Sequence, residues 1–238
     1  MKNTEQDAAT VGGTLVAEPF NSNFELSHDT YNGMSTGSNG KIYYVLCSES
    51  IDTGAQMYSY DPEADKIAHL GDLTEACGEK GAKSVPQGKC HSQFCEFKGK
   101  LYFATHVGYY NIEGARELMG VLPAGYSPYP GGHFLSYDMT TGKFEDLVKG
   151  PPAIGIQSMA MDTQRGRLYG TLWPNGNFLR YDLVTKEMKD LGLTSQQGEA
   201  GSGPTFRALC RSLVVNPEDG SVYFTNSDGE ILCLIGDN

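Results

Sequence analysis

The sequence has no apolar run of about 18 residues or more, so it predicts no transmembrane helix and no membrane insertion. Its N-terminal stretch, MKNTEQDAATVGGTLVAEPF, also lacks the apolar core of a signal peptide. As written, the chain is therefore predicted to be cytoplasmic. An export signal upstream of these residues would instead make the protein periplasmic or secreted.

Positive charge is scarce as well. Lysine and arginine total 18 against 29 aspartates and glutamates, which gives a net charge of −11. Contacts with nucleic-acid phosphates, or with an anionic membrane, need a basic surface. The composition therefore argues against a nucleic-acid partner and against binding to an anionic membrane.

Several common sequence motifs are missing. The six cysteines contain no CxxC pair, and four of them lie in or beside expected strands, which suits buried free thiols: Cys47, Cys95, Cys210 and Cys233. The chain also lacks a GxSxG nucleophile elbow, a GxxxxGK[ST] phosphate loop, a GxGxxG turn after a strand and an HExxH helix. The usual serine-hydrolase, nucleotide-binding and zinc-protease patterns are thereby excluded.

Glycine and aromatic residues are, by contrast, plentiful. The 30 glycines, 14 tyrosines and 10 phenylalanines favour strands joined by turns. Four segments repeat one pattern, a glycine-containing turn followed by an apolar and aromatic strand: GKIYYVLC (40–47), GKLYFATH (99–106), GRLYGTLW (166–173) and GSVYFTNS (220–227). A second strand follows each of them: QMYSYD (56–61), HFLSYD (133–138), NFLRYD (177–182) and EILCLI (230–235).

Two further strands complete the unit. One precedes the glycine turn in three of the units, as in SQFCEF, QSMAMD and RSLVVN, and a short one ends three of the units, as in TTGKFEDLV. Equivalent tyrosines are 54 to 67 residues apart: Tyr43, Tyr102, Tyr169 and Tyr223. A four-stranded antiparallel unit repeated at this spacing predicts an all-β fold, a β-propeller with four visible blades.

The fourth unit ends after its third strand, which leaves two interpretations. In the first, which we favour, the chain is part of a longer ring of about seven blades, and another chain covers its exposed blade edges. In the second, the N-terminal segment 1–30 supplies the missing strand, from GGTLVAEPF or NFELSH, and closes a four-bladed ring. The propeller is expected at 31–238, with blades at about 31–75, 90–150, 154–194 and 207–238.

Two segments, GRLYGTLWPNGNFLRYD and LCRSLVVNPEDGSVYFT, carry a resemblance to known proteins. They resemble bacterial β-propellers with quinoprotein-like or lactonase-like blades, above all a family without an assigned activity that carries GRLYGxxWPxGxFLRYD and CRSLxVxPxDGxVYFT. The resemblance covers about residues 35–238 and implies architecture rather than activity. The string HSQF is faintly similar to propeller polysaccharide lyases such as oligogalacturonate lyase.

Blade topology predicts which polar residues share a rim. The first strand of a blade starts at one face of the disk, the second strand ends there, and the third starts there again. His91, His106 and His133 occupy these positions in one blade, so we expect them on one face. Candidate binding residues come from equivalent positions and their loops: Gln93, Gln157, Trp173, Arg207, Arg211 and Asn226.

The longest insertion lies between His106 and His133 and contains four tyrosines: Tyr109, Tyr110, Tyr126 and Tyr129. Aromatic faces on such a loop can stack on a sugar ring or cap a pocket. Loops of this length are more often functional than connective.

Three roles stay open for the histidines. They hydrogen-bond loop backbone, or they hold a divalent metal such as Mn, Zn or Ca through His91, His106 and His133, or they act as acid and base. For Trp173, the alternative to a binding role is packing between blades.

Two functions follow from these candidates. The first is a polysaccharide lyase, in which an arginine or a metal neutralises a uronate carboxylate while a histidine or tyrosine transfers the proton. Its candidate catalytic residues are His91, His106, Tyr109, Tyr110 and Arg211, with Tyr126 among the substrate-binding residues. The second is a non-catalytic propeller that binds a carbohydrate, another small molecule or a protein on the same face.

Overall fold

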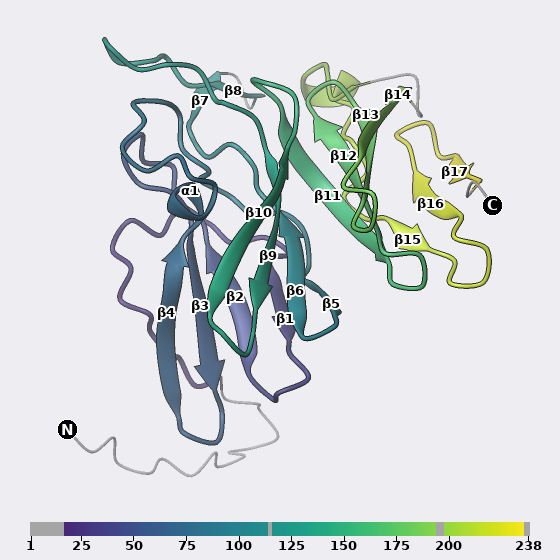
Figure 1. Ribbon diagram of the computed structural model, residues 1–238. Helices are drawn as coiled ribbons and strands as arrows, with labels where there is room; N and C mark the ends of the chain where they lie inside the picture. Colours follow the sequence, from purple (N-terminus) through teal and green to yellow (C-terminus); the bar gives the residue numbers. More distant parts are fainter. Residues whose placement is uncertain (1–16, 114–115, 194–197, 236–238) are drawn as a thin grey trace, which may run out of the picture.

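The computed structural model describes residues 17–113, 116–193 and 198–235. Four antiparallel sheets follow one another along the chain, from the purple N-terminal sheet to the yellow C-terminal sheet (Figure 1). Three of these sheets have four strands and the last has three. This is the blade arrangement of a β-propeller, as the sequence predicted, and the blades formed by the described residues do not close into a ring.

The strands follow the predicted meander. The first sheet contains β1 (Met34–Thr36), β2 (Ile42–Leu46), β3 (Gln56–Asp61) and β4 (Lys66–Asp72). The second contains β5 (Cys95–Phe97), β6 (Lys100–Ala104), β9 (His133–Asp138) and β10 (Lys143–Lys149). The third contains β11 (Gly155–Asp162), β12 (Arg167–Trp173), β13 (Asn177–Asp182) and β14 (Met188–Leu193). The fourth contains β15 (Val214–Val215), β16 (Val222–Thr225) and β17 (Ile231–Leu234).

Among the described residues, little regular structure lies outside the four blades. A four-residue helix, α1 (Leu73–Ala76), follows β4, and a 3-10 turn spans Gly203–Thr205. The long insertion in the second blade forms a hairpin of β7 (Tyr110–Glu113) and β8 (Arg116–Met119). Neither described helix is long and apolar enough to cross a membrane.

The recurring Tyr-Asp pair explains why the repeat folds. Asp61, Asp138 and Asp182 end the third strand of their blades, and each carboxylate accepts hydrogen bonds from the backbone N–H groups two and three residues later. Aspartates that bond in this way favour tight turns. Tyr137 and Tyr181, next to two of these aspartates, are buried between blades. The repeated pair is therefore structural.

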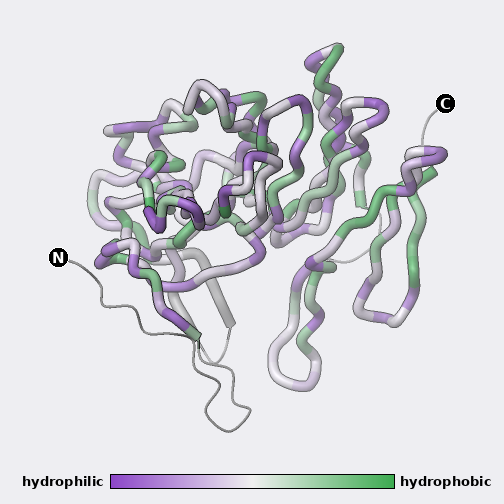
Figure 2. The backbone as a smooth tube through the Cα atoms, turned by 90° about the horizontal axis from the view of Figure 1, so that it is seen from below, coloured by the Kyte–Doolittle hydropathy of each residue, from purple (hydrophilic) through white to green (hydrophobic). Residues whose placement is uncertain are grey.

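Each inner blade buries both of its faces. On β6, Phe103 packs in a cluster with Tyr43 of the first sheet, whereas the adjacent Ala104 packs in a cluster with Ile156 of the third. A further cluster around Phe178 joins the third and fourth sheets. Figure 2 shows hydrophobic stretches along the strands and hydrophilic ones at many turns. The position of a residue in the pleat therefore decides which neighbouring blade it contacts.

The described residues of the N-terminal segment, 17–33, form no strand. The N–H of His28 donates to the carbonyl of Cys47, and the N–H of Cys47 donates to the carbonyl of Asp29, just beyond β2. NFELSH therefore lies against the first sheet and does not close a four-bladed ring. Part of GGTLVAEPF lies outside the described residues, and the longer ring stays a prediction.

Candidate functional site

Three side chains from two blades meet at one rim of the molecule. His91 precedes β5, His106 follows β6, and Gln157 belongs to β11 of the next blade. The amide oxygen of Gln157 is 3.0 Å from Nε2 of His106, and its nitrogen is 2.7 Å from Nδ1 of His91. The centroids of the two imidazole rings are 4.6 Å apart. The structure thus brings these three predicted residues together.

Glycines make this close approach possible. Gly88 and Gly108 face each other, and a Cβ on Gly108 would lie 2.5 Å from the Cα of Gly88. Gly155, at the start of β11, lies against the ring of His106, where a Cβ would be 2.4 Å from Nδ1. Only glycine lets backbone approach so closely. Reciprocal backbone hydrogen bonds between Lys89 and His106 then join the two segments of the second blade.

Gln157 sets the direction of the hydrogen bonds. An amide nitrogen can only donate, so Nδ1 of His91 accepts and the ring proton is on Nε2. The amide oxygen accepts from the Nε2–H of His106. Nε2 of His91 is buried and has no hydrogen-bond partner among the described residues. Because an unsatisfied buried donor costs about 1–3 kcal/mol, an acceptor atom of a ligand would be stabilised here.

A pocket of about 130 Å³ lies beside His91. Tyr31, in the N-terminal segment, stacks on the ring of His91 with 3.8 Å between centroids. Besides His91, the pocket wall combines one residue of the N-terminal segment with residues of the last three blades: Asn32, Ser92, Gln93, Met159, Arg211, Ser212 and Leu213.

A buried ion pair supports the segment that carries His91. Nζ of Lys89 is fully buried, 2.8 Å from Oδ2 of Asp29 and 3.0 Å from Oε1 of Glu49. It also lies over the ring of Tyr110, 4.5 Å from the centroid. Burial alone would lower the pKa of Lys89, but the hydrogen bonds to Asp29 and Glu49 outweigh it and raise that pKa. Lys89 is therefore charged at neutral pH.

Both rim histidines are neutral at pH 7. Burial lowers the pKa of His106 to about 3, although the hydrogen bond to Gln157 opposes the shift. Burial also lowers the pKa of His91 well below its ordinary value, helped by the nearby charges of Lys89 and Arg211. An efficient general base has a pKa near the operating pH. The pair is therefore better suited to hydrogen bonding than to proton abstraction.

The lowered pKa of His106 predicts sensitivity to acid. The imidazole of His106 becomes protonated near pH 6.5 in the unfolded chain but only near pH 3 in the folded protein. The contribution of neutral His106 to the free energy of unfolding is therefore complete above pH 6.5 and is lost as the pH falls toward 3. Between pH 7 and pH 5 we expect the wild type to lose about 2 kcal/mol more than His106→Gln. Urea unfolding at both pH values measures this, and equal losses would contradict it.

Arg211 lines the pocket, and the carboxylate of Glu199 holds its guanidinium in place. Its Nη2 donates to Oε2 of Glu199 at 2.8 Å, and Nε1 of Trp173 donates to Oε1 of the same carboxylate at 2.9 Å. Trp173 is buried, with its ring 5.3 Å from that of His106. It packs between His106 and Glu199, which fits the structural alternative, whereas Arg211 stays partly exposed at the pocket.

The hydroxyl groups of the predicted site tyrosines are engaged. Tyr109 and Tyr110 each donate to a backbone carbonyl, at 3.2 and 2.7 Å. The oxygen of Tyr110 is also 3.4 Å from Nδ1 of His106. Tyr126 bonds to Asp52, in the loop between β2 and β3. Of the three, Tyr110 contacts the histidine pair.

His133 lies apart from the other two histidines. Its Nδ1 is 2.9 Å from Oδ1 of Asp146, and its Nε2 is 3.2 Å from Oε1 of Glu79. Burial opposes protonation, but these two carboxylates outweigh it and raise the pKa of His133. Both ring nitrogens are therefore committed to ion pairs, so His133 has no nitrogen to offer a metal.

Strand pleating separates His133 from His106. The N–H of Thr105 donates to the carbonyl of His133, so these two residues are cross-strand neighbours. Side chains alternate between the faces of a sheet, and His106 follows Thr105 directly. His106 therefore faces the third blade and His133 faces the first. The structure does not assemble the predicted metal site of His91, His106 and His133.

Another group could hold a metal by distance alone. Ligand atoms of His28, Asp29 and Glu49 lie within 4.8 Å of one another. The ammonium of Lys89 already contacts both carboxylates and supplies the positive charge there. We therefore assign no metal to this group.

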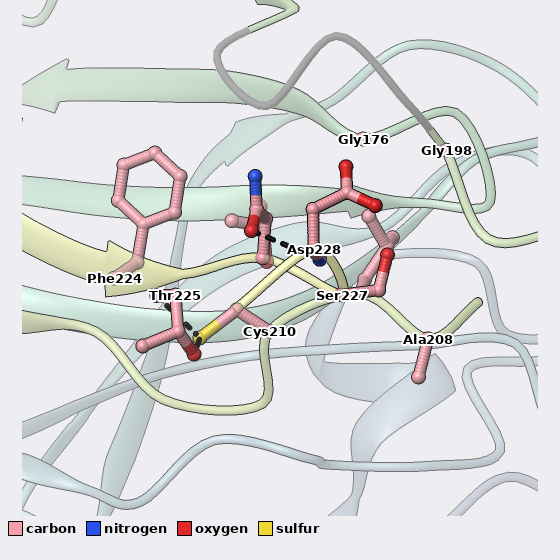
Figure 3. A pocket seen from close by; sticks show the side chains of 11 residues that line it. Gly176, Gly198, Ala208, Cys210, Phe224, Thr225, Ser227 and Asp228 are labelled. Carbon is pink, nitrogen blue, oxygen red and sulfur yellow. Dashed lines mark hydrogen bonds between the residues drawn. The ribbon is translucent and has the colours of Figure 1, made fainter. Parts of the chain in front are cut away.

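The other predicted residues have different surroundings. The side-chain oxygen of Asn226 accepts from two backbone N–H groups of the turn between β16 and β17. Asn226 borders a second hollow, in which Cys210 and Thr225 bond to each other (Figure 3). Arg207 is exposed and does not line the pocket beside His91, whereas Gln93 does.

Sequence reasoning missed four residues of this site: Tyr31, Asn32, Lys89 and Glu199. Three of them lie in segments without repeat character, so the alignment of blades carried no signal for them. For Lys89 the one available signal was its place directly before Cys90 and an expected strand, where a buried residue is more common than a charged one.

Comparisons with known proteins support the fold. The chain matches no protein-family model and no curated protein. It is similar to the solved extracellular domain of a one-component system from B. thetaiotaomicron, with 13% identity and a TM-score of 0.51 over 86% of this chain and 21% of that one. It is also similar to an auxiliary nutrient binding protein from Bacteroides thetaiotaomicron, with 14% identity and a TM-score of 0.50 over 87% of this chain and 39% of that one. The chain thus spans well under half the length of either structure.

Proposed function

We propose that this chain is a ligand-binding β-propeller whose pocket beside His91 holds a small molecule without altering it. The observation that carries the proposal is His91, which lines the pocket and whose buried Nε2–H has no partner among the described residues. Gln157 and Tyr31 fix the ring from two sides. Ligand sites are typically concave and largely pre-formed, with a few placed polar groups.

The chemistry of the surrounding groups favours binding over the predicted lyase activity. Both ring nitrogens of His106 have polar neighbours, and burial keeps its pKa far below neutral pH. The hydroxyls of Tyr109 and Tyr110 are bound to backbone carbonyls. A lyase needs a base matched to neutral pH, and these candidate groups do not supply one.

The similar structures are consistent with this proposal. One is a nutrient-binding protein and the other an extracellular domain. We therefore propose a ligand of nutrient size and an extracellular or periplasmic location, rather than the cytoplasm predicted from the sequence. A carbohydrate ligand remains a prediction from the sequence.

The variant His91→Phe tests the proposal, because it keeps a ring to stack on Tyr31 and removes the Nε2–H. Sugars, amino acids and small organic acids are screened for binding to the full chain by NMR. We expect the screen to yield a ligand that binds His91→Phe roughly tenfold more weakly than the wild type. His69→Phe, on β4, is the matched control and should bind as the wild type. A ligand indifferent to His91→Phe, or one converted to an unsaturated product, would contradict the proposal.

A further inference from the structure

The polar wall of the pocket presents a hydrogen-bond donor. The relay from His106 through Gln157 to His91 runs in one direction, because the Nε2–H of His106 donates to the amide oxygen and the amide nitrogen donates to Nδ1 of His91. This direction leaves the Nε2–H of His91, a residue that lines the pocket, buried and without a partner in the described part of the chain. A complementary ligand therefore places an acceptor atom against it.

Arg211 adds positive charge to the same wall. Its partner Glu199 also accepts from the indole of Trp173 and from the backbone N–H of Leu209, so this carboxylate is committed to the protein. The Arg211 side chain is 45% exposed and lines the pocket, and no carboxylate is found among the described residues that do so. Because charge-assisted hydrogen bonds are about twice as strong as neutral ones, an anionic acceptor is favoured.

Two apolar side chains complete a wall that is otherwise polar, and the space is small. Met159 and Leu213 line the pocket and are buried. The volume of about 130 Å³ is close to the ~150 Å³ of an engineered cavity that binds benzene. The pocket therefore has room for an organic group of a few carbon atoms beside the acceptor. A bare inorganic anion would leave Met159 and Leu213 without contacts.

We propose that the pocket binds the carboxylate of a small organic acid, with its oxygens at Nε2 of His91 and at the guanidinium of Arg211 and its short carbon chain against Met159 and Leu213. This inference rests on the proposed function, since it names the chemical class of ligand for the same pocket. The amide of Gln93, also on the wall, can donate to the same oxygens.

Propionate and propionamide isolate the carboxylate, because they have the same size and differ in charge. In NMR titrations of the full chain at neutral pH, propionate is expected to bind at least about tenfold more tightly than propionamide. Arg211→Met should weaken propionate binding roughly tenfold and leave propionamide nearly unchanged. Arg207→Met removes a neighbouring arginine that does not line this pocket, and should bind propionate as the wild type.

The outcomes separate this inference from the proposed function. Equal binding of propionate and propionamide, both lost in His91→Phe, would overturn the carboxylate assignment and leave a ligand-binding pocket. Binding of a neutral sugar without binding of propionate would do the same. If inorganic phosphate bound more tightly than propionate, the pocket would be a site for anions in general, and the assignment of an organic acid would be wrong. No binding by any probe or panel compound would overturn both proposals.

The ring nitrogens of His91 offer a readout that needs no ligand. Their ¹⁵N chemical shifts should show a proton on Nε2 and none on Nδ1, and the reverse would overturn the donor assignment. His91→Gln supplies an amide N–H at this position and should keep part of the propionate binding. Retention in that variant, with loss in His91→Phe, assigns the effect to the N–H rather than to misfolding.

Discussion

Replacing Lys89 with methionine is expected to lower the free energy of unfolding by about 3 kcal/mol or more. The Lys89 side chain is fully buried, and its ammonium contacts Asp29 and Glu49. Methionine keeps most of the volume, so the substitution removes the charge and leaves two carboxylates facing each other. Removing one partner of a buried ion pair typically costs about 3–5 kcal/mol.

Lys41→Met is the matched control for this substitution. Lys41 pairs with Asp61 at 3.3 Å but is 42% exposed, so its loss should change the stability by less than about 0.5 kcal/mol. Urea unfolding followed by circular dichroism measures both variants. Adding Asp29→Asn to Lys89→Met should restore part of the stability, because it removes one of the repelling carboxylates. A loss in Lys89→Met no larger than that in Lys41→Met would contradict this role of Lys89.

The sheets could be predicted because the signals of the repeat are local. A glycine turn, an aromatic strand and a Tyr-Asp pair each act within a few residues, and Asp138 caps its turn whatever the rest of the chain does. For this reason β3, β9 and β13 coincide with the predicted QMYSYD, HFLSYD and NFLRYD strands.

The first strands of two blades are shorter than predicted, for a tertiary reason. SQFCEF contributes β5 and RSLVVN contributes β15, each only in part. Just before these strands, side chains take up backbone N–H groups at the end of the neighbouring strand: Ser92 accepts from the N–H of Ala104, and Cys210 accepts from the N–H of Thr225. Contacts of this kind join residues distant in sequence, and a local pattern does not contain them.

The site could be predicted in part. Rim topology brought His91, His106 and Gln157 together, but it took no account of the pleat, which directs His133 to the opposite face of its sheet. Counting alternate residues along β6 and β9 would have separated the two histidines from the sequence alone. The buried position of Lys89 could not be inferred, because its carboxylate partners lie 40 and 60 residues away.

Replacing Phe134 with alanine is expected to cost about 3–5 kcal/mol. Phe134, on β9, is fully buried in the layer between the second and third sheets, with its ring 6.4 Å from that of Tyr181. Gly170, on β12 of the third sheet, lies against this ring, and a Cβ on Gly170 would be 2.9 Å from Cζ of Phe134. Because the backbone around Phe134 belongs to two packed sheets, we expect it to relax little into the cavity that alanine would leave. The loss in the free energy of unfolding should therefore lie in the upper part of this range.

Phe206→Ala, at a residue that is 47% exposed, is the control and should change the stability by less than about 0.5 kcal/mol. Urea unfolding can be followed by the fluorescence of Trp173, the single tryptophan, for the third blade and by circular dichroism for the whole chain. Since Phe134 belongs to a layer shared by two sheets, both signals should shift to the same lower midpoint. A fluorescence midpoint that stays at the wild-type value would mean that the third blade unfolds independently of the layer that Phe134 fills.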